Sequence, residues 1–182
     1  MILENGCVKL RAIEERDFDI LYNMLQSPEI EKAMGHCTVP ISPEQQKDWM
    51  SKYRNTDTQI RLMIELQNGN TIGVVMLFDI DRNNGTAEMG YKILAEKSER
   101  IKGDIDCALN ILLEYAFDFL RLNCIYSRTL VNNIPSEKLL DRLGFSIEGT
   151  LKQRIYQEGK YYDMHSFSMV KSQYDDKKSW SE

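Results

Sequence analysis

The stretch EKSERIKG at residues 96–103, followed without a break by DIDCALNILLEYAFDFL at 104–120, decides the fold of this chain. Apolar residues recur in its second part at steps of three and four, which is the period of a helix with one buried face. They are Ile105, Ala108, Leu109, Leu112, Leu113, Ala116, Phe117 and Leu120. Arg100, Lys102 and Gly103 stand where this helix begins, and helix N-termini bind anions through free N–H groups and the helix dipole. The stretch is therefore a candidate phosphate site, with a solvated turn as the alternative.

Length and composition describe one ordinary globular domain. A chain of 182 residues supports one well-formed core, and 42% hydrophobic with 28% charged residues is typical of a folded protein. We expect a single domain over residues 1–171, followed by a polar tail at 172–182 that frays.

The four cysteines argue against two kinds of site. Cys7, Cys37, Cys107 and Cys124 form no Cys-x-x-Cys pair, and no histidine lies at ligand spacing from them. Neither a disulfide framework nor a zinc site is expected from this pattern. We expect reduced, mostly buried thiols and no metal.

Charge and hydropathy narrow the range of partners. A net charge of −5 disfavours nucleic acid, because phosphate backbones bind concentrated positive surfaces. No apolar run approaches the length of a membrane span, and the first five residues lack a basic segment before an apolar one. We therefore expect a cytoplasmic protein with neither a nucleic-acid nor a membrane partner.

The other elements follow from periodicity and from residues that start or stop helices. Ser42 and Gln45 form an S-x-x-Q capping box, Asn68-Gly69 predicts a hairpin turn, and Gly144 is typical of a helix end. Pro28 is expected to close the first helix, because residues 29–39 show no firm period. The expected strands are 8–12, 60–66, 72–78, 86–94, 124–131, 145–156 and 161–170. The expected helices are 14–25, 42–53, 104–120 and 133–143.

The strand expected at 86–94 separates its side chains into two sets, because successive residues of a strand point to opposite faces. One face carries Ala87, Met89, Tyr91 and Ile93, and the other carries Glu88, Gly90 and Lys92.

Five local motifs accompany this order of elements. They are AEMGY at 87–91, RIKGDI at 100–105, N-x-x-S at 133–136, LGF at 143–145 with EG at 148–149, and GKYYD at 159–163. Together they resemble the GNAT superfamily of acetyl-CoA-dependent N-acetyltransferases, and within it the branch of ribosomal-protein N-terminal and spermidine acetyltransferases. The resemblance implies an α/β (α+β) fold with a mixed, mostly antiparallel sheet of about seven strands. About four helices would flank the sheet, which would be splayed between strands 4 and 5.

The same resemblance implies a function. The protein would move an acetyl group from acetyl-CoA, its cosubstrate, to a primary amine of a protein N-terminus, polyamine or amino sugar by direct attack on the thioester. We expect a monomer or homodimer with a small-molecule or peptide acceptor. The alternatives are a non-catalytic or ligand-binding module whose CoA loop is degenerate, and an acyltransferase for longer chains.

The resemblance also assigns the residues that would bind acetyl-CoA. They are Met89, Gly90, Tyr91, Arg100, Ile101, Lys102, Gly103, Asp104, Ile105, Asn133 and Ser136. Ile105 and Ile101 stand where the family pattern favours glycine or alanine, and β-branched residues are poorly suited to positive φ. Asp104 and Asp106 would repel a pyrophosphate in the first helical turn. We therefore expect a less open loop that relies more on Lys97, Arg100 and Lys102.

Catalysis requires a neutral amine and a proton for the departing thiolate. Glu88 is the candidate base, directly or through water, and the alternative is a structural ion pair with Arg128 or Lys92. Leu140 occupies the position where many relatives carry a tyrosine acid, so Ser136 or a bound water is the candidate donor. Ser136 could equally be a simple first-turn residue of its helix.

Three further expectations concern groups near this site. A backbone N–H near residues 89–91, turned inward by a bulge, would hold the oxyanion. Asp163 and Arg154 are expected to pair across the last hairpin, and neither His36 nor His165 suggests a nucleophilic system. The acceptor would be chosen within residues 21–53, where Trp49, Met50 and Tyr53 are pocket wall or core.

Overall fold

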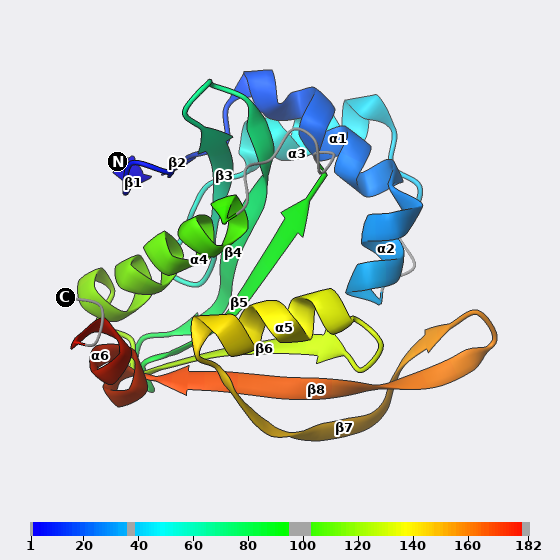
Figure 1. Cartoon of the computed structure of the whole chain (residues 1–182). Helices are drawn as coiled ribbons and strands as arrows, with labels where there is room; N and C mark the ends of the chain where they lie inside the picture. Colours follow the sequence, from blue (N-terminus) through cyan, green and yellow to red (C-terminus); the bar gives the residue numbers. More distant parts are fainter. Residues whose placement is uncertain (1, 36–38, 95–102, 180–182) are drawn as a thin grey trace.

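One sheet of eight strands forms the centre of the described chain, which is residues 2–35, 39–94 and 103–179 of the computed structural model. The strand order is β1-β2-β3-β4-β5-β6-β8-β7, and β5 and β6 are the parallel neighbours (Figure 1). The strands are β1 (Leu3–Glu4), β2 (Val8–Arg11), β3 (Ile60–Leu66), β4 (Thr71–Asp81), β5 (Thr86–Ile93), β6 (Cys124–Leu130), β7 (Ser146–Gln157) and β8 (Lys160–Val170). The predicted fold class is confirmed, with eight strands instead of about seven because β1 is too short to show a period.

Helices pack on both faces of this sheet (Figure 1). The helices are α1 (Phe18–Gln26), α2 (Pro28–Met34), α3 (Pro43–Lys52), α4 (Asp104–Glu114), α5 (Ile134–Leu143) and α6 (Lys171–Ser179). Apolar residues of α4 and α5 join the larger core cluster, which holds one face of the sheet. Apolar residues of α1 and α3 join a smaller cluster on the other face. Each face therefore has its own packed core, and β5 contributes Ala87 and Met89 to the larger one.

The helix boundaries confirm some predictions and correct others. The capping box of α3 is present, with Ser42 and Gln45 each accepting from the other's backbone N–H, and Gly144 ends α5 with a φ of 91°. Pro28 does not simply end a helix: it occupies the first turn of α2, and Ser27 accepts from the backbone of Ile30. Proline suits this position because the first N–H groups of a helix lack intrahelical partners.

The C-terminal segment was predicted to fray, and this prediction is wrong for the described part. Residues 171–179 form α6, which follows β8 directly. Asp118 accepts from Lys171 and Lys178 at 3.0 Å each, and the Tyr174 ring stacks on Phe117 at 4.8 Å. The polar segment can therefore form a helix, because its lysines pair with Asp118, which lies just beyond the end of α4.

The long predicted helix at 104–120 also changes character along its length. It is α-helical to Glu114 and continues as a π-helical turn over Tyr115–Phe119. The apolar stripe still faces the core, since Ala116 and Phe117 are buried. The π-helical turn departs from α-helical geometry, yet the apolar side chains of this segment remain packed in the core.

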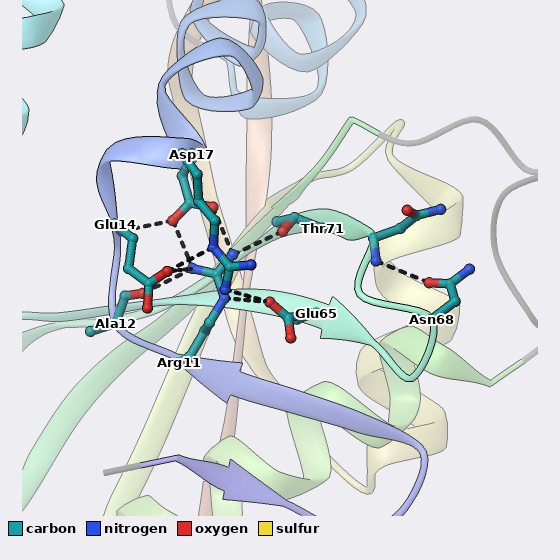
Figure 2. A network of polar contacts seen from close by, with 9 residues as sticks. Arg11, Ala12, Glu14, Asp17, Glu65, Asn68 and Thr71 are labelled. Atoms are coloured by element: carbon teal, nitrogen blue, oxygen red, sulfur yellow. Dashed lines mark hydrogen bonds and ion pairs between the residues drawn. The ribbon is translucent and has the colours of Figure 1, made fainter.

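A buried polar network ties the N-terminal elements to the sheet, and Figure 2 shows its geometry. Arg11 donates to both carboxylate oxygens of Asp17 at 2.7 Å and to Glu65 at 2.6 Å. It also donates to Thr71 Oγ1 at 3.0 Å and to the carbonyl oxygen of Ala12 at 3.1 Å. Hydrogen bonding to Asp17 raises the pKa of Arg11. One guanidinium therefore joins β2, the turn before α1, β3 and the start of β4.

The cysteines differ from the prediction. Cys7, Cys107 and Cys124 are free thiols, but Cys7 is exposed and the other two are half-buried. Burial, together with the neighbouring Cys7 thiol, raises the pKa of Cys107 to about 11. Cys37 lies outside the described residues. Among the described helices, none is both long enough and apolar enough to cross a membrane.

Candidate active site

The candidate site is a cleft of about 1490 Å³ where β5 and β6 separate. The two strands pair at only three positions, from Thr86 with Cys124 to Glu88 with Tyr126. Beyond Glu88 the strands diverge, as the ribbon of β5 in Figure 1 shows. The splay predicted between the fourth and fifth family strands is therefore found between β5 and β6.

Glu88 lies at the closed end of this opening and is 5% exposed. Its Oε1 accepts from Nε of Arg128 at 2.9 Å, and its Oε2 accepts from Nη2 of the same guanidinium. Hydrogen bonding to Glu88 raises the pKa of Arg128. Of the two ion pairs that the sequence allowed, the one with Arg128 is formed.

Tyr91 and Ser136 meet on the other side of the cleft. Their hydroxyl oxygens are 2.8 Å apart, and burial raises the pKa of Tyr91. Asn133 caps α5 by accepting from the Ser136 backbone N–H at 3.3 Å, and its amide donates to the carbonyl oxygen of Ala33 in α2 at 3.3 Å. The expected capping role of Asn133 is present, and Ser136 also has a side-chain partner that the sequence did not predict.

The alternation of β5 decides which face each of these side chains reaches. Ala87 and Met89 belong to the core cluster shared with α4, and Tyr91 packs against it. Glu88 is paired in register with Phe78 of β4, and Phe78 packs against the cluster shared with α1 and α3. The cleft therefore passes from one face of the sheet to the other.

The predicted bulge at residues 89–91 is not observed. The pairing of β4 with β5 is regular from Gly73 opposite Ile93 to Phe78 opposite Glu88, and the register shifts only beyond Phe78. The positive φ of 51° at Asp79 places the irregularity on β4 instead. No bulge is needed to free backbone groups of β5 for the cleft. Beyond Glu88, β5 no longer pairs with β6, so the backbone groups on that edge have no β6 partner.

The start of α4 shows how the chain accommodates the two acids and Ile105, which the sequence suggested would hinder pyrophosphate binding. Gly103 caps the helix with a φ of 102°, a conformation that glycine adopts readily. Ile105 lies inside α4 and lines the cleft, so positive φ is not required of it. Asp106 accepts from Arg142 of α5 at 3.0 and 3.2 Å, which offsets its charge. Asp104 is buried in the same turn.

Four predicted residues fall outside the described part of the chain. They are Lys97, Arg100, Ile101 and Lys102. Their proposed contribution to the pyrophosphate loop stays a prediction.

The Asp163 carboxylate in the last hairpin has partners that differ from the prediction. Asp163 accepts from Lys152 Nζ and from the Gln153 backbone at 2.8 Å each, so the expected pair with Arg154 is wrong. The reason is a register shift of β7 between Leu151 and Ile155, which changes the residues that face β8.

His165 also has a partner that the sequence did not indicate. The Nδ1 atom of His165 is 2.6 Å from an oxygen of Glu137 in the first turn of α5. The partner of this ring nitrogen is a carboxylate. His36 lies outside the described residues.

A second cavity, of about 340 Å³, lies on the face covered by α1 and α3. Trp49 lines it, whereas Met50 packs in the adjacent apolar cluster. Two cations, Arg61 and Lys92, also line it, and Lys92 lines the large cleft as well. Sequence reasoning missed Arg61, although a charged residue within the apolar strand 60–66 was a visible signal.

A splayed sheet with a helix N-terminus beside the opening defines the class of CoA-dependent acyltransferases. Residues 8–146 match the family described as the acetyltransferase (GNAT) domain. The chain belongs to this family.

Individual relatives agree over nearly the whole chain. It is 30% identical to the SPbeta prophage-derived uncharacterized N-acetyltransferase YokL of Bacillus subtilis, covering 91% of both chains. It is 27% identical to the putative ribosomal N-acetyltransferase YdaF of the same organism, covering 96% of this chain and 97% of the other. Spermidine N-acetyltransferase from Vibrio cholerae, solved in complex with CoA and spermine, superposes with a TM-score of 0.82 at 26% identity. That superposition covers 93% of this chain and 99% of the other.

Proposed function

We propose that this protein transfers an acetyl group from acetyl-CoA to a primary amine, with Glu88 as the base and Ser136 as the proton donor. The observation that carries the proposal is the opening between β5 and β6, which brings Glu88 and the Tyr91–Ser136 pair to one cleft. The N-acetyltransferase relatives and the CoA-bound neighbour support the activity. They do not favour a non-catalytic module.

The described part of the α4 terminus fits a CoA pyrophosphate. Gly103 leaves the approach to the first N–H groups open, since a Cβ built there would meet nothing within 4 Å. The charge of Asp106, which would oppose a phosphate, is paired with Arg142. Helix N-termini of this kind bind phosphate through backbone N–H groups and the helix dipole.

Acetyl-CoA supplies an activated thioester, and the protein's groups move the two protons. As the new C–N bond forms, Glu88 takes a proton from the amine, directly or through water. As the C–S bond breaks, the Ser136 hydroxyl gives its proton to the sulfur, and the Tyr91 hydroxyl at 2.8 Å can restore it. Because burial raises the pKa of Tyr91, this hydroxyl keeps its proton at neutral pH. Arg128 holds the Glu88 carboxylate in place.

The variant Glu88→Gln tests the base. We expect kcat/KM for a strongly basic amine to fall by about 100-fold or more in a thiol-release assay, as removal of a general base does. A weakly basic amine that is already neutral at the assay pH should lose much less, because it needs no deprotonation. Calorimetric affinity for acetyl-CoA should stay near that of the wild type.

The variant Arg128→Met is compared with Glu88→Gln to test whether the Glu88–Arg128 ion pair has only a structural role. If Glu88 only anchors Arg128, both variants will lose the same activity, and the loss will not depend on the basicity of the amine. That result would remove Glu88 as the base. Absence of thiol release with every amine, together with absence of acetyl-CoA binding, would overturn the activity itself.

A further inference from the structure

Most of the side chains that line the second cavity are apolar. Leu21 and Met24 of α1, Trp49 of α3, and Val74 and Met76 of β4 line it. A volume of about 340 Å³ accommodates a small organic group.

The charged groups of this cavity have one sign. Its described lining contains Arg61 and Lys92 but neither aspartate nor glutamate. The Arg61 guanidinium lies 5.5 Å from the ring centres of both Trp49 and Tyr53. With the Gln59 amide oriented to satisfy both partners, its oxygen accepts from Nε and Nη2 of Arg61 at 2.6 Å each. Aromatic rings and a neutral amide thus hold this cation.

Lys92 is the second cation and connects the cavity to the cleft. Its side chain lines both spaces, and burial followed by the charge of Arg61 lowers its pKa. Within the described residues, the ion pairs of the chain include neither Arg61 nor Lys92. Two like charges beside an apolar space are unfavourable until an anion joins them.

Strand register places these cations on the same face of the sheet as Glu88. Arg61 of β3 is opposite Met76, which is opposite Gly90, and Lys92 follows two residues later on the same face. Glu88 precedes Gly90 by two residues on this face. Alternate residues of a strand are about 7 Å apart, so the backbones of Glu88 and Lys92 are separated by about 14 Å. The long side chains of Glu88 and Lys92 shorten this span, so an amine near Glu88 and an anion near Lys92 can belong to one extended small molecule.

We propose that this cavity binds the acetyl acceptor and selects a primary amine that also carries an apolar body and an anionic group such as a carboxylate. The inference rests on the proposed acetyl transfer and narrows its acceptor class. Arg61 and Lys92 bind the anion, the apolar lining receives the body, and the amine points toward Glu88. A polyamine would instead bring further positive charge to two half-buried cations, and it is therefore a poor acceptor.

Matched acceptors that differ only in the carboxylate test this selection. The pairs are 6-aminohexanoate with hexylamine and 8-aminooctanoate with octylamine, whose two ends are far enough apart for this span, and spermidine is added as the polycation. We expect the better carboxylate of the two to exceed its matched amine by roughly 30-fold in kcat/KM, as for a buried charge pair. Spermidine should fall below both. Matched amines that perform as well as the carboxylates, or spermidine as the best acceptor, would overturn the proposal.

Variants at the two cations assign the effect to this cavity. Arg61→Gln and Lys92→Met should each lower kcat/KM for the carboxylate acceptor by roughly 30-fold and lower that of the matched amine by a clearly smaller factor. Lys160→Met, in the β7–β8 hairpin, makes the same chemical change at an exposed lysine and should leave both values unchanged. Equal losses for both acceptors would show that Arg61 and Lys92 do not bind the carboxylate.

Direct binding separates this inference from the proposed function. Calorimetric titration of wild-type protein with the N-acetylated carboxylate product should give binding that Lys92→Met weakens by a similar factor. Binding without thiol release would retain the cavity assignment while refuting the activity. Thiol release with amines that lack a carboxylate, without binding of the carboxylate product, would retain the activity and refute the assignment.

Discussion

Replacement of Arg11 by methionine should destabilise the fold more than any exposed charge change. The variant removes the five hydrogen bonds that Arg11 makes with the described residues. It leaves the Asp17 carboxylate, whose side chain is 2% exposed, without its main cation beside the Glu65 carboxylate. Removing one partner of a buried ion pair typically lowers the unfolding free energy by about 3–5 kcal/mol.

Urea denaturation at neutral pH measures this loss. With an m-value of about 2 kcal/mol/M, a loss of about 4 kcal/mol would lower the unfolding midpoint by about 2 M. Arg16→Met is the matched control, because Arg16 also donates to Glu65 at 2.9 Å but its side chain is 56% exposed. An exposed pair contributes about 0–1 kcal/mol, so this control should shift the midpoint by less than about 0.5 M.

The comparison of the two arginines decides whether burial is the cause. If Arg11→Met loses no more stability than Arg16→Met, the network does not stabilise the fold through a buried charge. A second check uses Asp17→Asn with Arg11→Met. The double variant should lose less than the sum of the two single losses, since residues of one network are coupled. Strict additivity would contradict the direct pairing seen in Figure 2.

Three further outcomes follow from single contacts. The hydrogen bond from Arg11 lowers the pKa of Glu65, so its stabilisation is present above the unfolded-state pKa and is lost as pH falls through the folded-state value. The stability difference between wild type and Glu65→Gln should therefore shrink in acid, as urea titrations at pH 7 and pH 3 would reveal; a growing difference would contradict this. Gly73→Ala should lose about 1–3 kcal/mol by thermal denaturation, because its Cβ would overlap a carbonyl oxygen of β5. Gly149→Ala, with nothing within 4 Å of its Cβ, should change stability little. Ser136→Ala should lower kcat by about 100-fold or more with little change in acetyl-CoA affinity, and an unchanged kcat would assign the proton to water.

The elements with a strong local signal could be predicted from the sequence. The capping box of α3, the glycine that ends α5 and the alternation of β5 each depend on a few neighbouring residues. Such signals act over one or two turns, so no knowledge of the rest of the chain is needed.

Elements that depend on distant contacts could not be predicted. α2 has seven residues, and it meets the last hairpin through Lys32, whose Nζ lies 2.8 Å from Glu158. Gly35 ends this helix against Ile155. Short helices gain most of their stability from tertiary packing, and this packing lies more than a hundred residues away in sequence.

The candidate site divides in the same way. Glu88 and Ser136 follow from motifs, whereas the contact of Ser136 with Tyr91 joins residues 45 positions apart. The cavity between Arg61 and Lys92 requires the register of three strands. A one-residue change of register would turn either side chain to the other face, so sequence pattern alone could not bring them together.

The side chains on the two faces of β5 can change independently of one another during evolution. Residues at even positions, such as Glu88, Gly90 and Lys92, belong to the face of the proposed acceptor cavity, whereas Met89 and Tyr91 belong to the side of α4 and α5. A point substitution at position 92 can therefore alter the proposed acceptor cavity while the opposite face retains its packing, whereas a Cβ at position 90 would lie 3.1 Å from the Phe78 ring. A single inserted residue would turn the side chains on one side of the insertion to the opposite face unless a bulge absorbed it, so a substitution changes the proposed site more selectively than a change in strand length.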